Sequence, residues 1–114
     1  MSGRDPTACI AVAEYAYHAA AHVLSFEWDH TKEARNIGKH GVDFDEASTT
    51  FYDEGGMEML DEEHSAREER WLRLAMSLHG RLLVTVFVER GDRIRIISSR
   101  PANRREVRVY ERGL

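Results

Sequence analysis

The chain has 114 residues, of which 42% are hydrophobic and 32% are charged, and its formal net charge is −4 at pH 7. This length suits a single domain with one core, and the only cysteine, Cys9, excludes an internal disulfide and favours a reducing compartment. No stretch is apolar enough for a membrane span or a signal peptide, so we expect a cytoplasmic protein that does not engage a membrane.

The first 24 residues are rich in alanine, and their apolar residues lie three or four positions apart, which predicts a helix over about 7–23. On that helix Glu14, His18 and His22 would share one face. Such a face could hold a metal ion, but no fourth ligand is in view. We therefore expect a solvated polar face and no metal or other cofactor.

A short strand and two helices are predicted next. The strand covers 25–28, and the first helix covers about 29–40 and ends at Gly41. The second helix covers 44–52 and begins with Asp43 as its cap. The side chains expected to face the core from these helices are Ala34, Ile37, Phe44, Ala47 and Phe51.

The second half of the chain alternates apolar and polar residues with the two-residue period of strands. The predicted strands cover 57–60, 70–78, 82–89 and 93–98. Asn103 then caps a final helix, with Glu106 in the reciprocal capping position. The predicted fold class is α+β: a small antiparallel β-sheet with two N-terminal helices and a C-terminal helix, preceded by the extra N-terminal helix.

Charge is divided unevenly between the middle of the chain and its end. Residues 43–69 include eleven acidic residues and one basic residue, Arg67, whereas residues 90–112 include eight arginines and three acids. The arginines are Arg90, Arg93, Arg95, Arg100, Arg104, Arg105, Arg108 and Arg112. This division predicts either two surfaces for two different partners or charges that neutralise each other across the fold.

The arginines of the last predicted strand favour a site for phosphate or carboxylate groups. Guanidinium groups bind such oxygens in pairs and stay protonated at working pH. Arg93 and Arg95 are two apart and therefore share one side of the strand. Arg95, in mid-strand, is the first candidate for phosphate contact, and Arg100, at the strand end, is the second. The alternative for each is an exposed strand residue or an ion pair with the acidic middle.

Several short motifs follow one another from residue 26 onward. They are F-E-W-D at 26–29, N-I-G-K-H-G-V at 36–42, F-D-E-A at 44–47, H-S-A-R-E-E-R-W at 64–71, L-L-V-T-V-F-V-E-R at 82–90, R-I-I-S-S-R at 95–100 and R-R-E at 104–106. In order and spacing they resemble the BrnT family of toxins over about 26–111. Two positions depart from that pattern: Ala75 stands where a glycine is expected, and Ser99 stands where alanine is commoner.

The resemblance implies a RelE-like fold and the toxin half of a bacterial type II toxin–antitoxin pair. The implied activity is that of a metal-independent endoribonuclease that cleaves RNA and halts translation. The implied partner is a BrnA-type antitoxin with a ribbon-helix-helix domain, which forms a hetero-oligomer with the toxin and alone contacts operator DNA. Family members usually begin near F-E-W-D, so we expect residues 1–24 to be an extension and 25–114 to be the toxin domain.

Metal-free RNA cleavage needs a base for the 2′-hydroxyl, an acid for the leaving 5′-oxygen and positive charge for the phosphorane. Arginine supplies the charge, whereas histidine or a carboxylate carries protons better. The family motif H-S-x-x-E-x-R contributes His64, Glu68 and Arg70, and the N-I-G-K-H motif contributes His40. The candidate catalytic residues are Arg95, Arg100, His64, Glu68, Arg70 and His40.

The residues expected to bind RNA are Lys39, Arg90, Arg93, Arg104 and Trp71. Trp28 and Trp71 could stack on unpaired bases, although a tryptophan beside apolar strand residues is more often part of the core. Structural roles are the alternatives for the other candidates. Lys39 and His40 are cations that suit the C-terminal end of a helix. Glu68 and Arg70 could form a fixed pair, and His64 could make only local hydrogen bonds.

Two further hypotheses stay open. A toxin homologue that has lost cleavage and acts as an antitoxin-binding co-repressor would use the same arginines against an acidic antitoxin segment. An unrelated small α+β domain is the third possibility. If the protein is a ribonuclease, Arg95→Ala is expected to abolish toxicity while leaving the fold intact.

Overall fold

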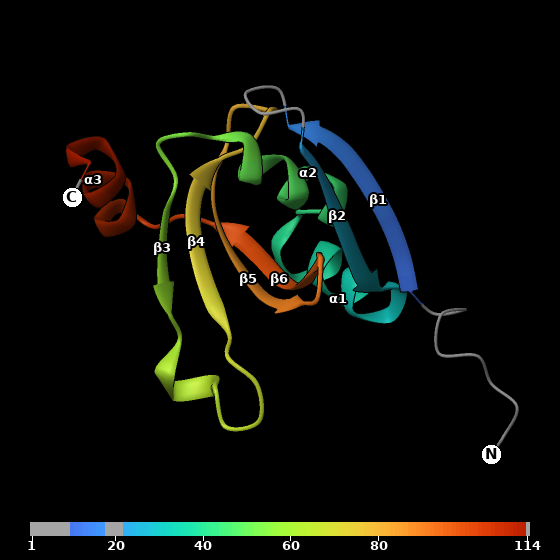
Figure 1. The fold of residues 1–114 in the computed structure, drawn as a ribbon. Coiled ribbons are helices and arrows are strands. Elements are labelled where there is room, and N and C mark those ends of the chain that lie inside the picture. Colours follow the sequence, from blue (N-terminus) through green and yellow to red (C-terminus); the bar gives the residue numbers. More distant parts are fainter. Residues whose placement is uncertain (1–9, 18–21, 114) are drawn as a thin grey trace, which may run out of the picture.

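The computed structural model describes residues 10–17 and 22–113, with side chains from Leu24 onward. Within these residues one six-stranded sheet in the order β1-β2-β6-β5-β4-β3 is combined with three α-helices (Figure 1). The strands are β1 (Ile10–Tyr17), β2 (His22–Asp29), β3 (Met57–Leu60), β4 (Trp71–Met76), β5 (Leu82–Arg90) and β6 (Arg93–Pro101). The helices are α1 (His30–His40), α2 (Phe44–Thr49) and α3 (Arg104–Arg112), with short 3-10 helices η2 (Thr50–Tyr52) and η3 (Glu62–His64). The predicted α+β class is confirmed. The sheet is mixed, however, because β2 pairs with β6 in parallel while the other neighbouring strands are antiparallel, so the expectation of a purely antiparallel sheet is wrong. The parallel pair joins strands far apart in the sequence, which local patterns do not reveal.

The N-terminal helix predicted over 7–23 is wrong where that segment is described. Strand β1 pairs antiparallel with β2 over eight residues, from Ile10 opposite Asp29 to Tyr17 opposite His22. The segment is rich in β-branched and aromatic residues, which favour strands, and the outer edge of β2 offers a row of backbone groups to pair with. Local alanine spacing could not reveal that partner. The side chains of the suggested metal face, Glu14, His18 and His22, lie outside the described side chains.

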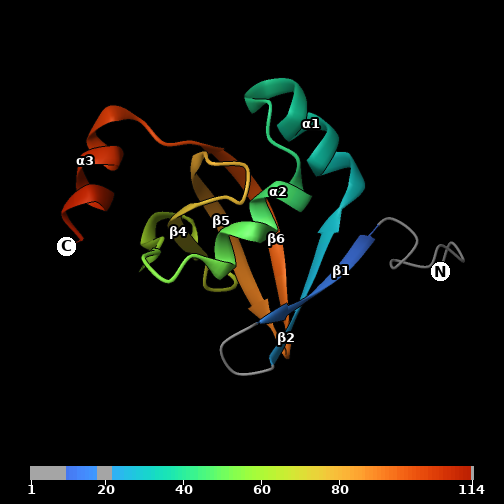
Figure 2. The same ribbon diagram turned by 90° about the horizontal axis from the view of Figure 1, so that it is seen from above.

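The core lies against the sheet, on the side of the sheet where α1 and α2 lie (Figure 2). Its members are Phe26, Trp28, Phe44, Ala47, Phe51, Phe87 and Ile96. Ring centroids of Phe51 lie 5.2 Å from Phe26 and 5.0 Å from Phe87, the spacing of favourable aromatic pairs. The predicted inward positions of α2 and η2 are thus confirmed.

The predicted inward positions of α1 are wrong. Ala34 is exposed and Ile37 is 46% exposed, whereas Asn36 is buried. Glu33 is only half exposed, and its carboxylate accepts hydrogen bonds from the indole of Trp28 and the backbone N–H of Phe44. Helix α1 therefore packs through polar contacts of Glu33 and Asn36 with backbone groups and with the indole of Trp28, which a search for apolar periodicity cannot detect.

Capping residues fix both ends of α1 and the start of α3. Asp29 accepts hydrogen bonds from the backbone N–H groups of Thr31 and Lys32, and Gly41 ends α1 in the left-handed region at φ 70°. The predicted capping box of α3, between Asn103 and Glu106, is confirmed. The helices found in the described ranges are too short and polar to cross a bilayer.

A bulge interrupts the pairing of β5 and β6. Val86 lies opposite Ser98 and Phe87 lies opposite Ile96, so Ile97 is an extra residue on β6. On the core side Ile96 is fully buried and the hydroxyl groups of Thr85 and Ser99 are 2.9 Å apart. The extra residue leaves Ile97 and Ser98, both partly exposed, side by side away from that core.

Candidate active site

Two hollows meet over the bulge of β6, and Ile97 and Ser98 line both of them. The first, of about 420 Å³, is also lined from α1 by Lys32, Arg35, Asn36, Lys39 and His40. The second, of about 400 Å³, is also lined by Asp61, Glu63, His64, Arg70, Leu72 and Val86. We call the two hollows together the β6 groove. The two hollows share Ile97 and Ser98, and the groove has a basic wall on α1 and a mixed wall on the segment 61–70.

The α1 wall is built by helical periodicity. Lys32, Arg35, Lys39 and His40 lie three, four and one positions apart, so they project from one side of the helix around Asn36. The side-chain NH₂ of Asn36 donates to the backbone carbonyls of Val42 and Ser99, at 2.9 and 2.8 Å. Within the described chain, no carboxylate forms a salt bridge with Lys32, Arg35 or Lys39, although the backbone N–H of Lys32 and, to a smaller extent, its charge lower the pKa of Asp29. Their charge is therefore available for an anion.

The opposite wall holds an imidazole and a guanidinium. His64 Nδ1 lies 3.0 Å from a carboxylate oxygen of Asp61, which directs Nε2 of the ring outward, and the side chain is 62% exposed. The backbone N–H of Arg70 donates to the hydroxyl of Ser65, which in turn donates to the carbonyl of Asp61. These bonds fix the turn, while the guanidinium of Arg70 has no ion-pair partner in the ranges that the structure covers.

Three arginines of β6 that the sequence favours are already engaged with carboxylates. Arg95 donates to Glu27 across the parallel β2–β6 pair at 2.9 Å, and Arg93 lies 3.7 Å from the same carboxylate. Arg100 donates two hydrogen bonds of 2.8 Å to Glu106. These hydrogen bonds raise the pKa of Arg100 and lower the pKa of Glu106. The ion-pair alternative thus describes all three, although the partners lie outside the acidic middle.

The remaining predicted residues divide between pairs, surface and core. Arg90 donates to Glu68 at 3.0 Å, which is an ion pair with the acidic middle. Glu68 lines a shallow hollow of about 290 Å³ that also includes His64 and Arg70. Arg104 is exposed in the first turn of α3. Trp71 is partly buried against the core cluster.

Trp28 is a core residue. It is 3% exposed, and its ring meets that of Phe44 edge to face at 6.1 Å. The suggestion that Trp28 stacks on an unpaired base is therefore wrong, because its faces are covered by protein. The expectation that a tryptophan beside apolar strand residues belongs to the core is confirmed for Trp28.

A buried carboxylate holds the end of α1 next to His40. Glu46 is 4% exposed and accepts hydrogen bonds from Arg81 Nε at 2.9 Å and from the hydroxyl of Ser77 at 2.8 Å. Arg81 also donates to the carbonyl of Gly41 at 3.0 Å. The hydrogen bond from Arg81 lowers the pKa of Glu46 in spite of burial, which acts in the opposite direction. The pair positions the loop that follows His40.

Sequence reasoning missed Lys32, Arg35, Ile97 and Ser98. The two cations of α1 carry a readable signal, since Lys32, Arg35 and Lys39 have the spacing of one helical face. The residues expected from the sequence to bind RNA lie mainly in the arginine-rich end of the chain. Ile97 and Ser98 reach the groove only because of the bulge, which depends on how β5 and β6 pair.

Comparison with known proteins agrees with this architecture. Residues 28–106 match the family model described as "Ribonuclease toxin, BrnT, of type II toxin-antitoxin system". The crystal structure of the Brucella abortus ribonuclease toxin BrnT superposes with a TM-score of 0.54 at 21% sequence identity, covering 68% of this chain and 94% of that chain. At that identity the likeness concerns the fold. No protein of curated function is significantly similar in sequence.

Proposed function

The chain belongs to the BrnT family of ribonuclease toxins of type II toxin–antitoxin systems, and from this premise we propose that the β6 groove binds and cleaves single-stranded RNA without a metal ion. One observation carries the proposal. The groove brings an imidazole from each wall, His40 and His64, to either side of Ile97 and Ser98, with unpaired cations next to both. Proton carriers and positive charge are the two requirements of this chemistry.

In the proposed reaction one imidazole takes the proton of the 2′-hydroxyl as that oxygen attacks the adjacent phosphorus. The other, protonated, gives a proton to the leaving 5′-oxygen, so the products are a 2′,3′-cyclic phosphate and a 5′-hydroxyl. Arg70 and Lys39 stabilise the added negative charge of the phosphorane. Lys32 and Arg35 extend the cationic track along α1 and hold the RNA backbone.

We assign indirect roles to the arginines that carboxylates already hold. Arg95, through Glu27, fixes β2 beside β6 and so positions the strand that carries the bulge. Arg100, through Glu106, fixes the start of α3. Arg90, Arg93, Arg104 and Glu68 lie outside the β6 groove, and we expect them to influence the path of longer RNA. We expect Trp71 to pack against the core rather than to stack on an RNA base.

The proposal includes the partners and setting that the family implies. The antitoxin is a BrnA-like ribbon-helix-helix protein that forms a hetero-oligomer with this chain and alone contacts operator DNA. Cleavage of RNA in the cytoplasm then halts translation until the antitoxin binds. We also propose a relationship to RelE-like toxins, and a toxin domain at residues 25–114 preceded by an extension of 24 residues.

The test is cleavage of a defined single-stranded RNA by purified, antitoxin-free protein in excess EDTA. The double variant His40→Gln/His64→Gln runs in parallel, and His30→Gln, an exposed histidine at the start of α1, is the matched control. Cleavage by the wild type and the control but not by the double variant supports the proposal. A folded wild type that binds RNA or antitoxin but never cleaves would favour the co-repressor hypothesis instead.

A further inference from the structure

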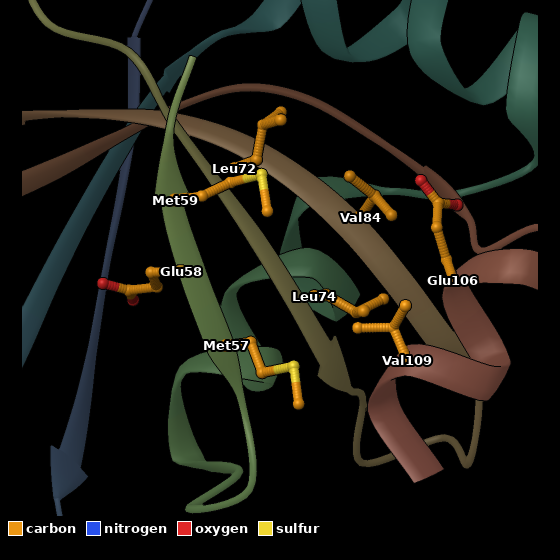
Figure 3. A pocket seen from close by; sticks show the side chains of 8 residues that line it. All are labelled: Met57, Glu58, Met59, Leu72, Leu74, Val84, Glu106 and Val109. Carbon is orange, nitrogen blue, oxygen red and sulfur yellow. The ribbon is translucent and has the colours of Figure 1, made fainter. Parts of the chain in front are cut away.

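An apolar hollow of about 220 Å³ lies between α3 and the strands β3, β4 and β5 (Figure 3). Its apolar lining consists of Met57, Met59, Leu72, Leu74, Val84 and Val109. Leu74 and Val109 point toward one another from β4 and α3, and the methionines project from β3, the last strand of the sheet (Figure 3). We call it the α3 hollow.

The exposure of its lining is unusual for this chain. Four large hydrophobic side chains are exposed in the part of the chain that the structure describes, and two of them, Met59 at 63% and Val109 at 36%, line this one hollow. Exposed apolar side chains that gather at one depression mark a surface for another molecule. Methionine adapts its shape to what it meets, which suits a protein partner.

The charges around the hollow indicate the chemistry of that partner. The two carboxylates at its rim are already neutralised, Glu58 by Arg73 and Glu106 by Arg100, each at 2.8 Å. Arg105 and Arg112 lie four residues before and three after Val109, so they share its side of α3. Neither has an ion-pair partner among the residues described. The wall of the hollow is therefore apolar with unpaired positive charge next to it.

The α3 hollow adjoins the β6 groove. Leu72 lines both, because it projects from β4 between them. A segment seated on Val109 and Met59 that continues past Leu72 would reach the wall that carries His64 and Arg70. A molecule bound there would thus close one side of the groove to RNA.

We propose that the α3 hollow is the docking site of the antitoxin, and that it accepts a segment with apolar side chains on one face and carboxylates on the other. Apolar side chains fill the space above Leu74 and Val84, and the carboxylates pair with Arg105 and Arg112. The bound segment would inhibit RNA cleavage because it continues past Leu72 and covers one side of the β6 groove. This inference rests on the proposed function, since it requires the antitoxin that the family implies.

The test uses the purified full chain and, as the probe, the BrnA-like antitoxin of the proposed function, taken from an open reading frame adjacent to this one. Binding is measured by calorimetric titration for wild type, Met59→Glu, Val109→Glu and Arg105→Glu/Arg112→Glu. Leu78→Glu, at a side chain 74% exposed on the β4–β5 turn, is the matched control. Each hollow variant is expected to bind about tenfold more weakly or worse, while the control binds like wild type.

Further measurements distinguish a failure of this inference from a failure of the proposed function. RNA cleavage without antitoxin should be unchanged in every hollow variant, which shows that each is folded. Hollow variants that bind the antitoxin as tightly as wild type overturn this inference and leave the ribonuclease proposal intact. A wild-type chain that cleaves RNA but does not bind the antitoxin probe would overturn both the proposed antitoxin partner and this inference. A dimer of the isolated chain that Met59→Glu converts to monomer, by light scattering, would show that a second copy occupies the hollow instead.

Discussion

Asn36 pairs with both backbone groups of Ser99 as a neighbouring strand would. Its side-chain oxygen accepts from the Ser99 N–H at 3.0 Å, and its NH₂ donates to the Ser99 carbonyl at 2.8 Å. Strand β2 pairs with β6 only as far as Glu27 opposite Arg95, so beyond that point β6 needs another partner on this edge. One amide side chain therefore ties the basic wall of the groove to its floor.

Replacing this amide should loosen the site and the fold together. Asn36→Leu removes three hydrogen bonds and leaves the N–H of Ser99 and two carbonyls unpaired in a buried place, so we expect about 3 kcal/mol lower unfolding free energy. Urea unfolding measures the loss. Ile37→Ala, at an exposed neighbour, should stay within about 0.5 kcal/mol of wild type. Equal losses for the two variants would contradict the strand-like role of Asn36.

Most of the fold could be read from local patterns. The limits of α1, the strands β3 to β6 and the capping box of α3 all follow from signals within a few residues of each other. The predictions failed where a partner distant in the sequence determines the local structure. The segment Ile10–Tyr17 is a strand because β2 is beside it, and α1 turns Asn36 inward because β6 lacks a strand there.

The candidate site shows the same limit. His40, Lys39, His64 and Arg70 could be named from the sequence, and the structure brings them to one groove. Their convergence depends on the bulge at Ile97, which no short motif encodes. The pairing of Arg95 with Glu27 joins residues 68 positions apart, so composition alone could not separate a paired guanidinium from a free one.

The two histidines of the groove should control the rate of RNA cleavage. His40→Gln or His64→Gln is expected to slow RNA cleavage by about 10²- to 10⁴-fold each, because proton transfer to or from the substrate is lost. Single-turnover cleavage of a defined RNA measures this loss for each variant. A variant that keeps the wild-type kcat would remove that histidine from the proton-transfer role.

The cations of α1 should contribute to RNA affinity mainly through salt-dependent contacts. Binding of a single strand weakens with salt in proportion to the number of phosphates neutralised, with a logarithmic slope of about 0.7 per contact. Lys32→Gln and Arg35→Gln should each reduce the slope by about 0.7, measured by fluorescence anisotropy on a catalytically inactive background. Arg108→Gln, an exposed cation on α3, is the control and should leave the slope unchanged.

Arg95 distinguishes a catalytic role from a positioning role. Its guanidinium is held by Glu27, whose side chain is 12% exposed, so Arg95→Ala leaves a nearly buried carboxylate with only the more distant Arg93. We expect about 2 kcal/mol lower stability, and a smaller loss when Glu27→Gln is already present. Cleavage per folded molecule should fall less than about tenfold in Arg95→Ala. A fall of a hundredfold or more with the fold intact would return Arg95 to the catalytic set.

Acid should destabilise the protein through carboxylates that arginines hold. Hydrogen bonds from Arg81 and Arg100 lower the pKa of Glu46 and Glu106 in the folded state, so the unfolded chain binds more protons as the pH falls. Their stabilisation is complete above the ordinary glutamate value of about 4.3 and is lost as the pH drops through the lowered folded value. Urea unfolding from pH 7 to pH 3 should therefore show a falling free energy. Glu46→Gln should lower stability at pH 7 and approach wild type at pH 3, because protonation then removes from wild-type Glu46 the charge that the variant already lacks. A constant difference between wild type and Glu46→Gln across that range would show that the Arg81 pair does not contribute to acid sensitivity.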